Sequence, residues 1–372
     1  MFTHLVLAAG VGSRFSNTSS KLLHPFPSAE NGCLVRLISQ LHESFPKDSI
    51  LLAVTTSTVV PQELLICSYL NIVCLDLQVG DNNSITVYKS LLLSSFDFQT
   101  SLVIWESDVY IDSYAFHLFS QFLLSLSSPK WSVLLTSIGV NPLILEGGFI
   151  SSKTKCPYIG AREDSGDFKL FGVTVISHDY LSSYFSLLSQ IVNSSSKFYF
   201  HQPFLGQSDI CFEVYDFSED KAFSFNTESQ LSAGLNRLNV SKTRLTLKYI
   251  DPFKLIPLEL TDSSRVKSLT DKIYNDQVWT TPLIVDTNSL VVMDGNHRHQ
   301  VSMFLKLTSV PCFLASYSLI KYWPLHSHLK LESFNDFMSD PTLLPFPYKS
   351  IKHSFDHIDL NFNPLPLSRL YS

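Results

Sequence analysis

The N-terminal stretch constrains the fold of this chain more than any other. The apolar run at residues 5–9 leads directly into a loop with glycines, and the basic side chains Arg14 and Lys21 follow. Glycine lets the main chain approach a ligand closely, and successive backbone N–H groups in such a loop form an anion-binding concavity. The residues of this predicted polyphosphate cradle are Ala8, Ala9, Gly10, Gly12 and Ser13. The alternative is an ordinary strand-to-helix turn with two glycines.

The segments after this loop alternate in type. Residues 34–45 have helical spacing with apolar side chains on one face, and residues 49–56 and 71–77 are short apolar runs. Such runs are typical of parallel strands that are buried on both faces. The order predicts an α/β fold with a Rossmann-like, mostly parallel sheet. Ligands of such sheets bind beyond the carboxyl ends of the strands, where the N-terminal loop lies.

Length and composition set broad limits. A chain of 372 residues predicts two domains, and 27 basic against 33 acidic residues give a net charge of −6. This balance argues against a nucleic-acid partner. No apolar run reaches about 18 residues and no secretory signal is evident, so we expect a soluble, cytoplasmic protein without a membrane partner. The six cysteines form no CxxC pair, which disfavours a zinc site or a disulfide framework.

A carboxylate follows the next apolar strand. Residues 102–105 lead into Glu106, Ser107 and Asp108, and a strand-end aspartate beside a triphosphate offers the hard oxygen that Mg²⁺ requires. Such an aspartate is also a common cap. The motif LAAGxGxR, a following lysine and SDVY together resemble the nucleotidyltransferases that make NDP-sugars, CDP-choline and similar compounds, whose fold is GT-A-like.

This resemblance implies roles for several residues. Arg14 and Lys21 would hold the phosphates of the incoming CTP, and Asp108 would bind Mg²⁺. The family carries a second metal ligand at a later strand-to-helix junction, which Asn226 matches. Asp216 or Asp220 would be the substitute if that correspondence slips by a few residues.

Two further regions belong to this predicted domain, residues 1–240. Asn82, Asn83 and Ser84 crowd the start of a helix, where one of them is expected as an N-cap. In the choline-phosphate cytidylyltransferases a similar segment borders the nucleotide, which implies the same role for Asn83 and Ser84. The strands at 147–152 and 170–177 would line the pocket for a phosphorylated acceptor.

A second domain is predicted over residues 245–372. Strands at 282–285 and 290–293 flank a hairpin turn, and the sequence Asp294-Gly295-Asn296-His297-Arg298 then opens an amphipathic helix. A helix N-terminus attracts phosphate through its free N–H groups and its dipole. The alternative is a capped helix start with a surface ion pair. The motif DGNHR resembles the ParB/sulfiredoxin-like superfamily, which would make this a smaller α+β domain.

Three branches of that superfamily compete. Sulfiredoxin chemistry needs a cysteine where this chain has Asn296, and the tail after Lys321 shows no helix-turn-helix of the kind that ParB proteins use on DNA. The third branch, the free-serine kinases, implies Asp294 on Mg²⁺ and Glu259 as general base. The implied nucleotide-binding residues are Gly295, Asn296, His297 and Arg298.

Other interpretations of this domain stay open. Glu259 could be a solvated residue ahead of a helix at 264–274. The family uses residues after the core domain, which implies that Trp323, His353 or His357 borders the substrate.

Together the halves predict a bifunctional enzyme. A nucleotide, ATP or ADP, would phosphorylate a small hydroxylated metabolite such as serine, and CMP transfer from CTP would then give a CDP-linked product and pyrophosphate, with Mg²⁺ at both sites. One alternative is a nucleotidyltransferase with a regulatory nucleotide-binding domain, and another is a ParB-type CTP- and DNA-binding protein. A homo-oligomer is compatible with either.

Overall fold

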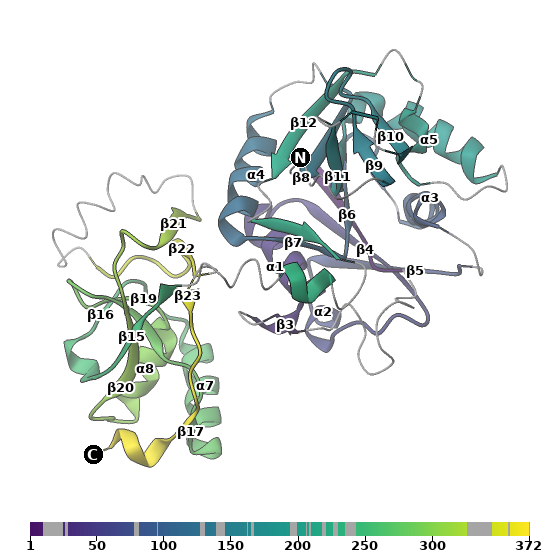
Figure 1. Ribbon diagram of the computed structural model, residues 1–372. Coiled ribbons are helices and arrows are strands. Elements are labelled where there is room, and N and C mark those ends of the chain that lie inside the picture. Colours follow the sequence, from purple (N-terminus) through teal and green to yellow (C-terminus); the bar gives the residue numbers. More distant parts are fainter. Residues whose placement is uncertain are drawn as a thin grey trace. The chain divides into compact units, whose positions relative to one another are not determined.

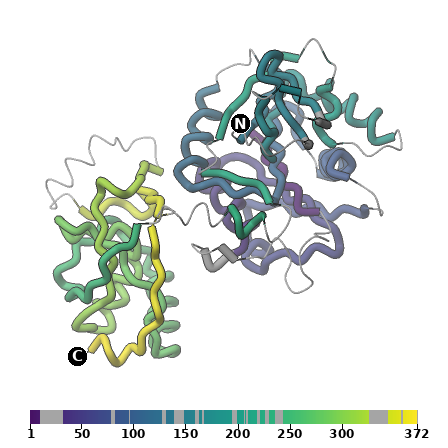
Figure 2. Tube along the Cα trace, viewed as in Figure 1, coloured from purple at the N-terminus to yellow at the C-terminus, as the bar shows by residue number. Residues whose placement is uncertain are grey.

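The computed structural model divides the chain into two compact units, Met1–Leu238 and Asn239–Ser372. The residues that the structure describes are 1–9, 25–26, 29–77, 82–94, 96–126, 131–138, 146–161, 163–164, 167–193, 199–205, 207, 210–217, 221–225, 230–234, 243–325, 344–355 and 358–371. Helices and strands are labelled in Figure 1, and Figure 2 traces the chain through each unit.

Unit 1 is built on a nine-stranded sheet, counted over its described residues. Its main order is β10-β9-β11-β6-β1-β4-β5, and β8 pairs with both β11 and β12. The neighbours β6, β1, β4 and β5 are parallel, whereas β11 runs antiparallel to β6. The strands are β1 (Phe2–Leu7), β4 (Ser49–Thr55), β5 (Leu70–Leu75), β6 (Ser101–Glu106), β8 (Val133–Ile138), β9 (Glu146–Ile150), β10 (Pro157–Ala161), β11 (Phe168–Ile176) and β12 (Phe212–Phe217).

Helices cover both faces of this sheet (Figure 1). Because side chains alternate along a strand, Val6 and Trp105 pack in one core with helices α1 and α4, whereas Leu5 and Ile104 pack in a second core with α3 and α5. This two-sided burial explains why the central strands are continuous apolar runs. The helices are α1 (Cys33–Ser44), α2 (Gln62–Leu65), α3 (Asn83–Leu93), α4 (Ser113–Ser125), α5 (His178–Val192) and the 3₁₀ turn η2 (Gln202–Phe204).

Two short ladders complete the described part of unit 1. They pair β7 (Val109–Ile111) with β13 (Ala222–Ser224), and β2 (Pro25–Phe26) with β3 (Ala29–Gly32). The first of these ladders matters for function because it brings the chain at residue 224 beside the residue that follows Asp108.

Unit 2 holds a five-stranded sheet in the order β15-β20-β18-β19-β16, with helices α7 and α8 packed on its core. The elements are β15 (Thr246–Ile250), η3 (Pro252–Lys254), β16 (Ile256–Pro257), α7 (Ser263–Asp276), β18 (Leu283–Asp286), β19 (Val291–Asp294), α8 (Asn296–Phe304) and β20 (Val310–Ala315). Three small ladders pair β14 (Thr243–Arg244) with β23 (Ile358–Asp359), β17 (Val278–Trp279) with β24 (Leu365–Pro366), and β21 (Lys321–Pro324) with β22 (Ile351–Ser354). The chain ends in the 3₁₀ turn η5 (Leu367–Leu370).

The α/β class and the large, mostly parallel sheet predicted from the sequence are confirmed, as is a smaller α+β unit after it. The predicted helices at 34–45 and 264–274 are observed at Cys33–Ser44 and Ser263–Asp276. The structure adds one thing that the sequence did not predict. The segment after Lys321 returns to its own unit and pairs with it through β22, β23 and β24 (Figure 2).

Candidate functional site

The predicted phosphate loop begins at the carboxyl end of β1. Ala8 and Ala9 are buried there, and the Ala8 N–H donates to the Ala53 carbonyl at 2.9 Å. Thr58 Oγ1 donates to the Ala8 carbonyl at 3.4 Å. The remaining predicted cradle residues, Gly10, Gly12, Ser13, Arg14 and Lys21, lie outside the described residues. The chain therefore enters the loop from a fixed point between β4 and β6.

The predicted metal ligand Asp108 lies in the turn between β6 and β7. Two backbone hydrogen bonds hold this turn: Ser107 N–H donates to the Leu7 carbonyl at 3.3 Å, and Phe225 N–H donates to the Asp108 carbonyl at 3.0 Å. A hydrogen bond thus joins the carboxyl ends of β1 and β6. Asp108 follows β6, and the predicted phosphate loop follows β1. The Asp108 side chain is half-buried.

The candidates for a second metal ligand differ in what the structure says of them. Asn226 and Asp220 lie outside the described residues, although Phe225, the neighbour of Asn226 in sequence, is bonded to Asp108. Asp216 is exposed on β12, and its Oδ1 accepts a hydrogen bond from Ser137 Oγ at 2.6 Å. The choice between Asn226, Asp216 and Asp220 as second metal ligand stays a prediction.

The polar residues at the start of α3 have two different roles: one caps the helix and another contacts the sheet. Asn82 is the N-cap, since its Oδ1 accepts from the N–H groups of Ser84 and Ile85. Asn83 Nδ2 instead donates to Glu106 Oε1 at 3.1 Å, which ties α3 to the end of β6. Ser84 is buried. The expectation that one of the three residues caps the helix is confirmed. Asn83 contacts Glu106, which lies two residues before Asp108 in the sequence.

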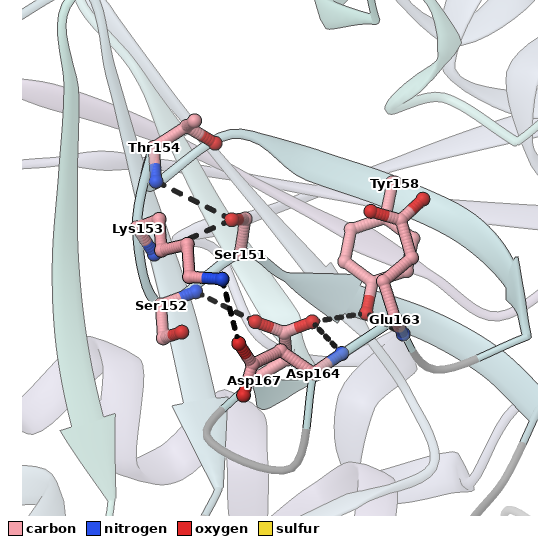
Figure 3. Close-up of polar contacts among 8 residues, drawn as sticks. All are labelled: Ser151, Ser152, Lys153, Thr154, Tyr158, Glu163, Asp164 and Asp167. Atoms are coloured by element: carbon pink, nitrogen blue, oxygen red, sulfur yellow. Dashed lines mark hydrogen bonds and ion pairs between the residues drawn. The ribbon is translucent and has the colours of Figure 1, made fainter.

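The strands predicted at 147–152 and 170–177 are observed as β9 and β11, and their role in lining an acceptor pocket stays a prediction. A cluster of polar side chains fastens the β9–β10 hairpin to the start of β11 (Figure 3). The buried Asp167 carboxylate accepts from Tyr158 Oη at 2.5 Å, from Ser152 N–H at 2.8 Å and from Asp164 N–H at 3.0 Å. Lys153 pairs with Asp164 at 3.0 Å on the surface of this cluster. The first residues of β11 are consequently held in place.

In unit 2, the strand-to-helix junction brings Asp294 and Arg298 together. Gly295 has φ +96°, a conformation that favours glycine, and a Cβ there would lie 2.7 Å from Leu283 Cδ2. Arg298 Nη2 donates to Asp294 Oδ2 at 2.7 Å, and its Nη1 donates to the carbonyls of Thr281 at 2.9 Å and Pro282 at 2.6 Å. The guanidinium is thus anchored on the backbone and orients the carboxylate.

The first residues of α8 hold the neighbouring segment. Asn296 Oδ1 accepts from the N–H groups of Leu258 at 3.0 Å and Glu259 at 3.4 Å, and its Nδ2 donates to the Val292 carbonyl at 3.4 Å. The buried Asn296 side chain therefore positions Glu259. His297 Nε2 accepts from Asp262 N–H at 3.2 Å, and burial, helped by the nearby Arg265, lowers the pKa of His297.

Glu259 is held by the tail of the chain. Ile351 N–H donates to Glu259 Oε1 at 2.6 Å, and β-bridge pairing joins Glu259 to Phe346. Burial raises the pKa of Glu259, backbone N–H groups of residues 349–351 oppose that rise, and the Asp294 carboxylate adds to it. The interpretation of Glu259 as a solvated residue is wrong. Its carboxylate is half-buried and within electrostatic reach of Asp294.

The tail also contributes a buried aromatic cluster. His353 Nε2 lies 3.3 Å from Tyr317 Oη, and Tyr322 and Phe355 pack on the same ring. Burial lowers the pKa of His353 to about 4, while the Asp294 carboxylate opposes that shift. Trp323 is buried on β21, and His357 lies outside the described residues. His353 is therefore near the charged centre of unit 2, and its contact with a substrate stays a prediction.

The donor sets fit magnesium held jointly with a nucleotide. Within the described residues, no group of three or more His, Cys, Asp or Glu side chains converges to hold a metal alone. Mg²⁺ in nucleotide enzymes takes one or two carboxylates and fills its octahedron with phosphates and waters. Asp108 lies at a strand end, and Asp294 is half-exposed and oriented by Arg298. Each therefore offers the single carboxylate that such a magnesium ion needs from the protein.

Sequence reasoning overlooked several residues of these sites. The sequence gives Glu106 only as part of the strand end that leads to Asp108, and Lys169, which lies within electrostatic reach of Glu106, belongs to no motif. The backbone cradle around Glu259 comes from residues some 90 positions later, which a single sequence does not reveal. The signal that could have identified Glu106 is its position, since a charged residue rarely ends a buried strand without a partner.

Comparison with known proteins supports the fold. No family model matches the chain. The CTP:phosphocholine cytidylyltransferase of Streptococcus pneumoniae superposes with a TM-score of 0.50 at 14% identity, covering 64% of this chain and 99% of that one. The resemblance of the N-terminal part to nucleotidyltransferases is thereby confirmed at the level of the fold.

Two curated proteins match a shorter part of the sequence. A ParB-like protein of Sulfolobus acidocaldarius is 33% identical over 72 residues, 19% of this chain and 36% of its own. An ATP-dependent L-serine kinase of Desulfurococcus mucosus is 27% identical over 95 residues, 23% of this chain and 37% of its own. The chain thus spans little more than a third of either relative. Among the described residues, no helix is long and apolar enough to cross a membrane.

Proposed function

We propose that this protein is a two-step enzyme. Unit 2 phosphorylates the hydroxyl of a small metabolite, serine or a close relative, and unit 1 transfers CMP from CTP to the resulting phosphomonoester. The observation that carries the proposal is a carboxylate at a strand end in each unit. Asp108 is bonded through its turn to the strand that enters the glycine loop, and Asp294 precedes the glycine at the start of α8.

The phosphorylation step needs a base and a fixed terminal phosphate. Glu259 accepts the proton of the substrate hydroxyl, whose oxygen attacks the terminal phosphorus. A new P–O bond forms as the bond to the leaving nucleotide breaks, giving ADP from ATP or AMP from ADP. Burial raises the pKa of Glu259, which makes its carboxylate a stronger base than an exposed one. His297, Arg298 and the amides of Gly295 and Asn296 are the groups proposed to hold the phosphates.

The nucleotidyl step needs mainly alignment and charge neutralisation. An oxygen of the acceptor phosphate attacks the α-phosphorus of CTP, the α–β phosphoanhydride bond breaks, and pyrophosphate leaves. The acceptor is already anionic, so no general base is needed. Arg14 and Lys21 bind the triphosphate, and Asn83 and Ser84 border the nucleotide. Asp108 and Asn226, and Asp294 in unit 2, would hold magnesium, which would neutralise the developing phosphate charge.

The comparisons support both halves of the proposal. One structural neighbour of unit 1 is a CTP:phosphocholine cytidylyltransferase, and one of the two partial relatives is an ATP-dependent L-serine kinase. A kinase that makes a phosphomonoester and a transferase that consumes one form a reaction sequence within a single chain.

The decisive experiment supplies serine, CTP, Mg²⁺ and either ATP or ADP, and follows CDP-serine by mass spectrometry and pyrophosphate by ³¹P NMR. We expect both products from the intact chain. Asp108→Asn should accumulate O-phosphoserine, and Asp294→Asn should form the CDP product only when O-phosphoserine is added. No nucleotide consumption across a panel of amino acids and small alcohols would reject the proposal.

The same variants separate the alternatives. If unit 2 only regulates unit 1, no metabolite is phosphorylated and Asp294→Asn changes only how nucleotide affects transfer. If the chain is a ParB-type protein, it should retard duplex DNA in a salt-sensitive manner. The net charge of −6 disfavours that second outcome.

A further inference from the structure

The turn that meets the Glu259 carboxylate contains a backbone conformation that its sequence does not favour. Lys349 has φ +57°, in the left-handed region that glycine adopts readily and lysine adopts rarely. A residue in this region persists only where its surroundings enforce it, and such residues cluster at functional sites. We call residues 348–351 the tail turn.

The tail turn is fastened to unit 2 on both sides. Before it, Phe346 N–H donates to the Leu258 carbonyl at 2.8 Å, and Leu260 N–H donates to the Phe346 carbonyl at 2.7 Å. After it, β22 pairs with β21, and Leu325 N–H donates to the Ser350 carbonyl at 2.8 Å (Figure 1). The first two bonds flank position 259, so the tail turn and that position are fixed relative to each other.

The amides of the tail turn converge on Glu259. Ile351 N–H donates to Glu259 Oε1 at 2.6 Å, and the N–H groups of Ser350 and Lys349 are bonded to the same carboxylate. Ser350 Oγ donates to the Pro347 carbonyl at 2.6 Å and closes the turn. Successive N–H groups in a turn of this kind form an anion-binding concavity. The left-handed backbone of Lys349 is therefore what lets three consecutive amides face one carboxylate.

Such a set of donors governs both the charge and the direction of the carboxylate. Hydrogen bonds from N–H groups favour the ionised form, and here they oppose the rise in pKa that burial causes. A carboxylate has about four acceptor positions, so three amide bonds leave about one for the proton of a substrate hydroxyl. Without the amides, the Glu259 side chain could occupy several rotamers.

We infer that Lys349 is a positioning residue of the phosphorylation step, because its left-handed backbone holds three amides that aim the Glu259 carboxylate at the substrate hydroxyl. This inference rests on the proposed function. The role belongs to the backbone: the Lys349 side chain is exposed, with Nζ 5.6 Å from the centroid of the Tyr348 ring. The tail is then a working part of the phosphorylation site.

The test replaces Lys349 by residues that differ in their tolerance of a left-handed backbone. Lys349→Val introduces a β-branched side chain that disfavours this conformation. It should lower kcat for serine phosphorylation about tenfold and change the KM for serine less than about twofold, because the turn contacts the base and not the substrate. Lys349→Gly adopts the conformation without steric cost and should rescue kcat to within about twofold of wild type. Equal kcat values in the two variants would overturn the inference.

Lys306→Val is the matched control. Lys306 is also an exposed lysine of unit 2 with a left-handed backbone, φ +52°, and it follows α8 rather than contacting Glu259. The substitution imposes the same strain elsewhere, so it should lower the Tm to a similar extent as Lys349→Val and leave kcat within about twofold. A tenfold loss of kcat in this control would show that strain alone lowers activity, and would overturn the positioning role.

A double variant tests whether the tail turn acts through Glu259. Residues that act as a unit have non-additive effects on rate. Lys349→Val should therefore change the residual rate of Glu259→Gln less than about twofold, although it lowers the wild-type rate about tenfold. A further tenfold loss in the double variant would mean that valine at position 349 acts on another group, which contradicts the inference.

Amide hydrogen exchange separates this inference from the proposed function, because it needs no nucleotide. Glu259→Ala removes the acceptor and should accelerate exchange of the amides of residues 349–351 about tenfold, as resolved by mass spectrometry. Faster exchange in this variant, with no serine phosphorylation by the wild-type chain, would keep the aimed carboxylate and reject the function. Phosphorylation by the wild-type chain, with unchanged exchange in Glu259→Ala, would keep the function and overturn the inference.

Discussion

Asp108 and Asp294 are proposed for the same task, yet the two units hold them differently. In unit 1 the turn of Asp108 is fixed by backbone hydrogen bonds, from Ser107 to Leu7 and from Phe225 to Asp108 itself. In unit 2 the Asp294 carboxylate is oriented by the side chain of Arg298, which is in turn anchored on two backbone carbonyls. One arrangement depends on sheet architecture, and the other depends on a single guanidinium.

The difference has consequences for substitution. Backbone bonds survive the exchange of nearly any side chain, so the backbone of the Asp108 turn should tolerate changes in the side chains of Ser107, Leu7 and Phe225. The position of Asp294 is sensitive to one residue, because a planar guanidinium that serves three acceptors has no equivalent among other side chains. Substitution of Arg298, which positions Asp294, should therefore lower the activity of unit 2. No single side chain has the corresponding role among the contacts given above for the Asp108 turn.

The largest expected effect comes from the carboxylates themselves. Asp108→Asn should lower CMP transfer, and Asp294→Asn should lower serine phosphorylation, each by about 10²- to 10³-fold, because the charge that attracts Mg²⁺ is lost. Each variant should leave the other step unchanged when that step is assayed with its own substrate. A variant that lowers both steps alike would show that the two units do not carry separate reactions.

The next effect tests the contrast directly. Arg298→Lys should lower phosphorylation about 10- to 100-fold, since an ammonium cannot keep the bonds to Thr281, Pro282 and Asp294 together. Arg36→Lys in unit 1 is the matched control, because Arg36 also donates to a backbone carbonyl, that of Ile111, and lies outside the proposed chemistry. Equal activity of Arg298→Lys and wild type would remove the proposed dependence on a single side chain.

The same contrast explains what the sequence could predict. Strand-end motifs made Asp108 and Asp294 candidates, and their strand ends are where the sequence predicted, because a strand and the turn after it are local in sequence. The contacts that place the other residues are long-range: Asn83 with Glu106, Asn296 with Leu258, and Glu259 with Ile351. A single sequence carries no signal for such pairings. Asn296 is an example. Its motif implies a nucleotide contact, but the sequence does not reveal that its side chain holds the segment of Glu259.

A third prediction concerns Glu259 and the pH dependence of phosphorylation. Burial raises the pKa of this carboxyl, and only its ionised form can accept the substrate proton. The rate should therefore rise with pH through this raised pKa and then level off. Glu259→Gln should lower the rate about 10²-fold and remove the acidic limb of the profile, as measured by steady-state assays. An unchanged acidic limb in the variant would assign the titration to another group.

The smallest expected effect asks whether the two units differ in anything besides how they hold their carboxylates. Each has a buried neutral histidine, His201 in unit 1 with a pKa lowered to about 3 and His353 in unit 2 with a pKa lowered to about 4, both by burial. An unfolded chain binds a proton at these sites near pH 6.5, whereas the folded chain does not. The stability that each provides is therefore complete above that pH and falls as pH drops toward the folded value.

Between pH 7 and pH 5 this linkage amounts to about 2 kcal/mol for one such histidine. Replacing His353 by glutamine, or His201 by glutamine, should reduce the acid sensitivity of the corresponding unit by that order of magnitude and leave the other unit as it was. Hydrogen exchange followed by mass spectrometry under urea resolves the units separately. If the two wild-type units lose stability in parallel as the pH falls, their buried histidines behave alike. The units then differ only in how Asp108 and Asp294 are held in place. If unit 2 loses stability far earlier, its tail-built interior is the weaker one, and the sensitivity expected of Arg298→Lys would reflect general fragility rather than the orientation of Asp294.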